Sequence, residues 1–224
     1  MKNLQPIHFF LSSNEEYKIA EKMVDLLTQR LTLAAKKIVQ VKAICHSASE
    51  KPSELIPNDC IILHSLLHHV INNNKSLDQI ESDWSDLYKK RKADFNRATY
   101  FLTIFQYFDN SDYRNPLCGI EEKIQRIREL NLLAIKLSHL HQFKIIDLDS
   151  IFTKLGAIKT STDYTLRGDT AQAIAADLIS STLLERHFSN FEVLGNDSKE
   201  EFIAGGYQEF FARAVQLVVN FNKP

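Results

Sequence analysis

Serine and histidine side chains follow the predicted strands of this chain, and these residue types suit nucleophilic catalysis. Ser13 comes just after the apolar run 7–11, where the chain is expected to turn into a helix. Amide N–H groups at a helix N-terminus can stabilise an oxyanion, which makes Ser13 the candidate nucleophile. Ser13 and Glu16 also have the spacing of a capping box, so a purely structural role for Ser13 stays open.

Histidines near the third predicted strand are candidates for a general base. His64 and His68 would share one face of a helix, a spacing found in some zinc sites, but no third ligand completes the set. We therefore expect no metal and no cofactor. His46, His64 or His68 could instead take the proton of Ser13, because loops after neighbouring parallel strands meet at one sheet edge. Loop polarity without catalysis is the alternative.

Other polar residues in these loops are candidate substrate ligands: Ser12, Asn14, His46, Ser65 and Arg167. Asp163 could orient a histidine or organise its turn. Arg167 could contact a bound anion, and Asp169 is expected to cap the last helix of the domain.

Apolar runs alternate with helical periodicity along the first 188 residues. The predicted strands are residues 7–11, 38–45, 60–63, 100–108 and 143–148, and amphipathic helices separate them. Strands joined through helices pair in parallel, which predicts a three-layer α/β/α sandwich with a five-stranded, flavodoxin-like sheet.

The composition narrows the class of partner. The 224 residues include 27 basic and 28 acidic side chains, with no basic block that would track phosphates, so nucleic acid is not expected. No apolar run approaches membrane-spanning length, and the N-terminus lacks a signal-peptide core. Three cysteines without metal-like spacing fit a reducing compartment. We expect a cytoplasmic protein.

The chain divides into a domain at 1–188 and a C-terminal helical extension at 189–224. After Gly205-Gly206 an apolar stripe at helical spacing runs from Tyr207 to Phe221. This extension either packs back on the domain or forms an interface with a second copy or another protein partner.

Over residues 7–187 the chain resembles the SGNH/GDSL hydrolases. Leu11-Ser12-Ser13 stands where that family has Gly-Asp-Ser, which keeps serine at the nucleophile position. The family's oxyanion-hole asparagine would fall near Leu67. Its Asp-x-x-His motif corresponds to Asp163-Tyr164-Thr165-Leu166, in which aspartate is kept and histidine is replaced.

This resemblance implies a serine ester hydrolase with a nonstandard site. Ser13 would attack acyl or acetyl esters of a carrier, a glycan or a small molecule, and turnover would be slow without the expected oxyanion donor and histidine. The alternative is a protein that keeps the pocket without the chemistry and serves as a binding or scaffolding protein.

Overall fold

Strands and helices alternate along the computed structural model, which describes residues 6–36, 38–48, 60–72, 75–89, 98–108, 119–188 and 214. The strands are β1 (Ile7–Leu11), β2 (Ala43–Ser47), β3 (Ile61–Ser65), β4 (Ala98–Leu102) and β5 (Lys144–Ile146). The helices are α1 (Asn14–Ala35), α2 (His68–Ile71), α3 (Leu77–Lys89), α5 (Ile120–His141), α6 (Leu148–Leu155), α7 (Ala157–Thr160), α8 (Asp169–Leu183) and the π-helix η1 (Leu184–Phe188).

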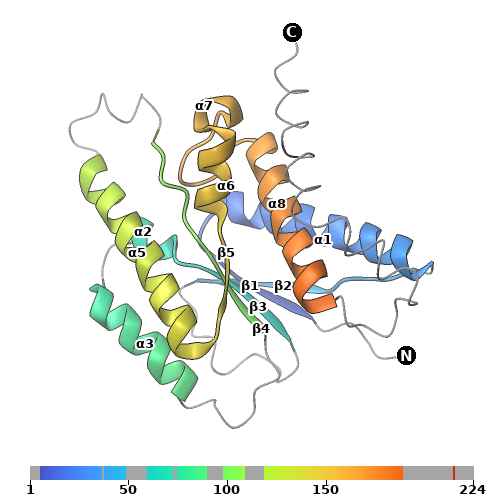
Figure 1. The fold of residues 1–224 in the computed structure, drawn as a ribbon, viewed down its shortest axis with the longest axis horizontal. Coiled ribbons are helices and arrows are strands. Elements are labelled where there is room, and N and C mark those ends of the chain that lie inside the picture. Colours follow the sequence, from blue (N-terminus) through green and yellow to red (C-terminus); the bar gives the residue numbers. More distant parts are fainter. Residues whose placement is uncertain are drawn as a thin grey trace.

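The strands form one five-stranded sheet in the order β2-β1-β3-β4-β5 (Figure 1). Every pairing is parallel, because each strand returns to the sheet through a crossover segment. This order confirms the predicted flavodoxin-like α/β/α sandwich.

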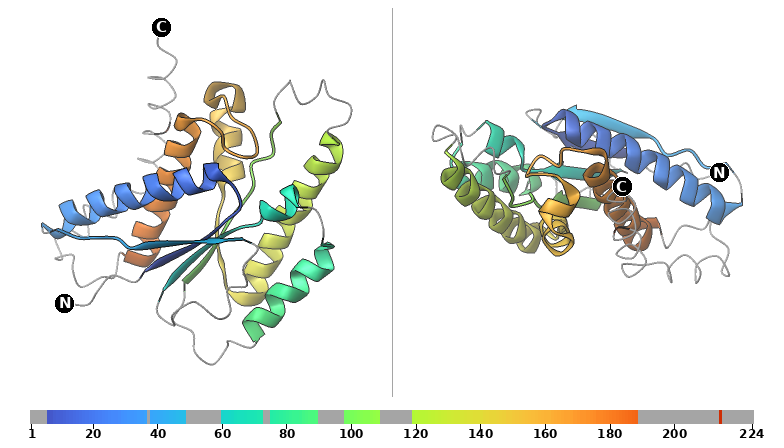
Figure 2. Two further views of the ribbon diagram at one scale, coloured as in Figure 1. Left: turned by 180° about the vertical axis from the view of Figure 1, so that it is seen from behind. Right: turned by 90° about the horizontal axis from the view of Figure 1, so that it is seen from above.

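Helices cover both faces of the sheet (Figure 2). On one face, α1 and α8 pack against each other and against the side chains of Ile7, Phe9, Leu63 and Tyr100. On the other face, α3 and α5 enclose a second core that includes Trp84, Phe101, Ile127, Leu130 and Phe143. Successive residues of each strand alternate between these two layers, so one-residue steps decide which face a side chain joins.

The second strand begins at Ala43, later than the sequence predicts. Val39 lies before this strand. Its backbone N–H and carbonyl are hydrogen-bonded by a side chain of α1 and not by a neighbouring strand. The Thr32 hydroxyl accepts a hydrogen bond from the Val39 N–H (3.1 Å) and donates one to the Val39 carbonyl (3.2 Å). The alternating pattern of this segment therefore reflects buried Val39 and Val41, not strand pairing.

The fourth strand ends at Leu102, although the predicted strand continued to residue 108. Beyond it, side chains of two helices satisfy the extended backbone. Asn131 of α5 bonds both the N–H and the carbonyl of Ile104, each at 2.8 Å, and Asp149 of α6 accepts from the Gln106 N–H at 2.8 Å. These hydrogen bonds fix the segment after β4 in an extended conformation at the carboxyl edge of the sheet.

Other element boundaries also differ from the sequence predictions. The fifth strand is shorter, because Asp147 already caps α6 by accepting from the Ser150 N–H at 3.1 Å. Helix α8 begins at Asp169, but its N-cap is Gly168, so the predicted cap role of Asp169 is wrong. Of the cysteines in the described residues, Cys60 is buried and Cys45 is exposed.

Beyond Phe188 the structure describes Ala214 alone. Ala214 is helical and fully buried in the core cluster beside α1 and α8. The predicted division at residue 188 and the predicted interface on the extension otherwise fall outside the described residues and stay predictions. Within the described segments, no helix combines the length and apolar character needed to cross a membrane.

Candidate functional site

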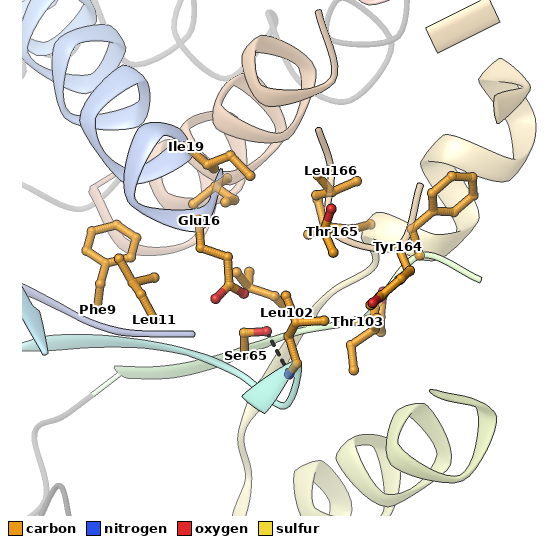
Figure 3. A pocket seen from close by; sticks show the side chains of 15 residues that line it. Phe9, Leu11, Glu16, Ile19, Ser65, Leu102, Thr103, Tyr164, Thr165 and Leu166 are labelled. Carbon is orange, nitrogen blue, oxygen red and sulfur yellow. Dashed lines mark hydrogen bonds between the residues drawn. The ribbon is translucent and has the colours of Figure 1, made fainter. Parts of the chain in front are cut away.

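A pocket lies at the carboxyl edge of the sheet, on the face covered by α1 and α8 (Figure 3). Its unfilled space is about 470 Å³, including space open to solvent. Most of its walls are apolar: Phe9, Leu11, Ile19, Leu67, Leu102, Ile104, Phe105, Leu148, Leu166 and Ile179. Its polar lining residues are Glu16, Ser65, Thr103, Tyr164 and Thr165. The carboxyl edge is where open α/β sheets place ligands.

Glu16 carries the one carboxyl group among these lining residues. It lies in the first turn of α1, is only 8% exposed, and its Oε2 accepts from the Ser12 N–H at 2.6 Å. Burial raises the pKa of the Glu16 carboxyl, and hydrogen bonds from Ser65, Ser12 and the nearby backbone oppose part of that rise. The helix start thus holds a carboxyl at the pocket wall that resists ionisation.

Ser65 ends strand β3 on the pocket side and is 3% exposed. Its Oγ accepts a hydrogen bond from the Leu67 N–H at 3.1 Å, which leaves the hydroxyl proton available for donation. In Figure 3 the Glu16 side chain reaches from α1 toward Ser65. The hydroxyl is close enough to lower the pKa of that carboxyl as a hydrogen-bonding partner.

Ser13 is the N-cap of α1, in extended conformation with φ −141° and ψ 160°. Its Oγ accepts from the Glu16 N–H at 3.2 Å, which confirms the predicted capping contact. The Glu16 carboxyl returns the bond to the N–H of Ser12, one residue earlier than the motif predicts. Ser12 and Ser13 are partly buried beside the pocket, and Asn14 is exposed.

His64 and His46 lie on the opposite face of the sheet from Glu16. Both rings stack on Phe10, at centroid distances of 5.5 Å for His64 and 4.9 Å for His46. His64 also meets the edge of Trp84 at 4.4 Å. Burial lowers the pKa of His64 to about 3, and the charges of nearby histidines add to this. His64 is therefore a neutral core side chain at physiological pH.

His68 begins α2 and is partly buried. Its Nδ1 lies 3.1 Å from the Asn72 side-chain nitrogen. Partial burial, helped by the charge of Lys75, lowers its pKa. Across the described residues, no cluster of histidine, cysteine, aspartate or glutamate has the arrangement of a metal site.

Asp163 is 2% exposed in the turn before α8. One carboxyl oxygen accepts from the N–H (2.9 Å) and hydroxyl (2.6 Å) of Thr165. The other accepts from the Arg167 Nε at 2.7 Å and forms an ion pair with its Nη2. Arg167, which the sequence predicts to contact a bound anion, is thus bonded to the Asp163 carboxyl. In the resemblance, that carboxyl would orient a catalytic histidine.

Leu166 is buried in the pocket wall with φ +58°, a left-handed conformation that leucine rarely adopts. It stands where the resemblance places histidine. Because Leu166 has no proton to exchange, this position supplies shape to the pocket but no base.

The structure therefore brings Ser65, Ser12 and Ser13 near the Glu16 carboxyl, and it places His46 and His64 across the sheet. The catalytic and substrate-binding roles predicted for these residues stay predictions. Glu16 was missed because its spacing from Ser13 was interpreted only as a capping signal. The strand alternation at His64 and Ser65 was the signal that could have separated the two faces.

No protein-family model matches this chain, and no curated protein matches it. Solved structures do. The acetyl xylan esterase AlAXEase is 15% identical over 80% of this chain and 99% of its own, with a TM-score of 0.55. A lipase/acylhydrolase from Enterococcus faecalis is 13% identical over 80% and 95% of the two chains, with a TM-score of 0.58.

A GDSL-like protein from Parabacteroides merdae is 15% identical over 80% of this chain and 94% of its own, with a TM-score of 0.51. These likenesses concern the fold. The chain has an SGNH/GDSL-like hydrolase fold.

Proposed function

We propose that this SGNH/GDSL-like fold hydrolyses acyl or acetyl esters at a low rate, with the acyl group held in the pocket. One observation supports this most: an apolar pocket with serine hydroxyls inside it and beside it lies at the carboxyl edge of the parallel sheet. The apolar walls suit an acyl group, and a serine could attack the ester carbonyl there.

Ser13 is the nucleophile predicted from the sequence, and its position at the start of α1 supports that role. The helix amides beside it favour developing negative charge. The resemblance places the family's oxyanion-hole asparagine near Leu67, whose side chain has no hydrogen-bond donor. Losing one such donor costs about 2.7–4 kcal/mol of transition-state stabilisation, so slow turnover is expected.

The substrate class in this proposal is an ester of a small molecule, a carrier or a glycan. Some structural neighbours are named acetyl xylan esterases, which supports a glycan ester as one candidate.

The experiment combines fluorophosphonate labelling, intact-mass analysis and peptide mapping with hydrolysis of p-nitrophenyl acetate and longer acyl esters. A stoichiometric serine adduct with measurable turnover is expected. Ser13→Ala then tests the predicted nucleophile, because an unchanged adduct and rate would remove Ser13 from the mechanism. Absence of both an adduct and turnover, while a control serine esterase is modified, would contradict ester hydrolysis.

A second candidate function is ligand binding without turnover. It is favoured by the last loop, where Leu166 replaces the histidine and Arg167 occupies the Asp163 carboxyl. In that case short acyl amides and esters should raise the melting temperature of the protein while no ester is consumed. A Leu166→Phe variant, which fills the pocket, should abolish that shift.

A further inference from the structure

Glu16 and Ser65 come from different elements and meet inside the pocket. Glu16 descends from the first turn of α1, and Ser65 ends β3 on the same face (Figure 3). Both are more than nine-tenths buried, with exposed fractions of 8% and 3%. A buried carboxyl facing a buried hydroxyl is the arrangement of a base and its proton donor.

The other aliphatic hydroxyls of the pocket are committed elsewhere. The Thr103 hydroxyl donates to Asp147 at 3.0 Å, and the Thr165 hydroxyl donates to Asp163 at 2.6 Å. Ser65 instead uses its oxygen as an acceptor, for the Leu67 N–H, which leaves its proton free to be donated, and the Glu16 side chain points toward it (Figure 3). Among the pocket-lining threonines and serine, Ser65 is thus the hydroxyl placed for transfer of its proton to Glu16.

We propose that Ser65 and Glu16 form a nucleophile–base pair that acts on acyl esters in this pocket. This inference rests on the proposed ester hydrolysis for its reaction class, and it assigns the proton transfer to a carboxylate in place of the missing histidine. It also offers Ser65 as the attacking serine where the sequence pointed to Ser13.

The reaction balances without a cofactor. The Glu16 carboxylate takes the Ser65 proton as Oγ bonds to the ester carbonyl carbon, which gives a tetrahedral oxyanion. Collapse of this species breaks the C–O bond to the alcohol, which leaves with the proton from Glu16. Water then loses a proton to Glu16 and attacks the acyl-serine, and Ser65 departs with that proton as the free acid forms.

The surroundings strengthen this base and select its substrate. Burial raises the pKa of the Glu16 carboxyl, which makes the ionised form a stronger proton acceptor. Tyr164 is the other titratable residue that lines the pocket, and none of the lining residues is a lysine, arginine or histidine. Without a cation to balance a second negative charge, the pocket favours neutral acyl groups over acyl chains that carry a carboxylate.

The first test uses the unmodified protein. Fluorophosphonate labelling followed by peptide mapping should place the adduct on Ser65. The labelling rate should rise with pH as Glu16 ionises. Mapping needs no variant, so it stays informative even where a substitution impairs folding.

Matched variants then test the base. Glu16→Gln keeps an acceptor for the Ser12 N–H but cannot take a proton, and it should slow labelling and ester hydrolysis about 10²–10⁴-fold. The control is Glu15→Gln, which makes the same change at the preceding position, outside the pocket lining. Ser65→Ala should abolish the adduct, while Ser138→Ala on α5, outside the pocket lining, should not. Thermal unfolding verifies that each variant is folded.

The outcomes separate this inference from the proposed function. An adduct on Ser13 that forms equally fast in Glu16→Gln would overturn the Ser65–Glu16 pair and leave ester hydrolysis standing. Turnover without any adduct on Ser65, unchanged in Ser65→Ala, would do the same. If neither an adduct nor hydrolysis is observed, the proposed function itself fails, and the pair fails with it.

Discussion

His64 and Ser65 are neighbours in β3, yet they belong to opposite sides of the molecule. His64 faces α3 and α5, and Ser65 faces the pocket beneath α1. Both are almost fully buried, at 3% exposure each. Burial alone therefore does not distinguish a core side chain from a candidate functional one; the difference lies in what surrounds each group.

On the α3/α5 side, rings fill the space around the histidine. His46, Phe10, His64 and Phe101 form a row across β2, β1, β3 and β4, with successive centroids 4.9, 5.5 and 5.6 Å apart. A charged imidazole would be poorly solvated among these rings, which is why the pKa of His64 falls to about 3. His64 therefore acts as a packing side chain of the core.

On the α1/α8 side, the pocket leaves unfilled space next to a carboxyl. Glu16 also loses solvation, but backbone and serine donors surround it and the unfilled space of the pocket adjoins it. A buried titratable group becomes a functional candidate when it has a proton partner and room for a substrate. The two sides thus predict different responses to substitution.

The largest expected effect comes from emptying the aromatic side. Phe101→Ala removes a fully buried ring that contacts His64, Trp84 and Phe143, and it should lower the free energy of unfolding by about 3–5 kcal/mol. Urea denaturation measures this. At temperatures where the variant stays folded, fluorophosphonate should still react at the pocket. Loss of less than about 1 kcal/mol would show that this side is not the tightly packed one.

A smaller effect is expected at the loop that bounds the pocket. Arg167→Ala leaves the buried Asp163 carboxyl with the Thr165 donors alone and should cost about 1–3 kcal/mol of stability. Urea denaturation of the variant and the natural protein at one pH measures this cost. A cost below about 0.5 kcal/mol would show that the ion pair does not hold this loop.

The aromatic side also predicts a response to acid. His64 stays neutral in the folded protein and takes up a proton in the unfolded chain, so its contribution to stability is present above pH 6.5 and is lost as pH falls toward about 3. His64→Phe keeps a ring without a titrating nitrogen. The free energy of unfolding of the natural protein should fall by about 2 kcal/mol more than that of the variant when the pH is lowered from 7.5 to 5. Urea denaturation at the two pH values measures this difference.

His69, whose pKa is lowered to about 4, supplies a second acid-sensitive contribution that remains in the His64→Phe variant. Some pH dependence should therefore persist. Parallel stability curves for variant and natural protein between pH 7.5 and 5 would show that His64 is not held neutral.

The sheet and its order were predictable from sequence, because short apolar runs alternate with helical periodicity. The limits of β2 and β4 were not, since Thr32 and Asn131 give extended backbone its hydrogen-bond partners without a neighbouring strand. Ser13 was correctly predicted as a cap. The position of the Glu16 carboxyl in the pocket depends on how α1 packs over β3, which local spacing does not encode.

The smallest expected effect concerns stability at the pocket carboxyl. Because burial raises the pKa of Glu16, its stabilising contribution is present below the ordinary glutamate pKa and is lost as pH rises through the folded-state value. Glu16→Gln removes this dependence, so the variant should gain stability relative to the natural protein between pH 4 and pH 8. Glu15→Gln, the same change one position earlier and outside the pocket lining, is the control. Hydrogen bonds from Ser12 and Ser65 to the ionised Glu16 carboxyl limit the size of this gain. If Glu16→Gln instead loses stability relative to the natural protein as pH rises, these hydrogen bonds outweigh the cost of desolvating the carboxylate. Glu16 would then be a structural carboxylate. The unfilled space of the pocket would be the remaining difference between this side of the sheet and the side of His64.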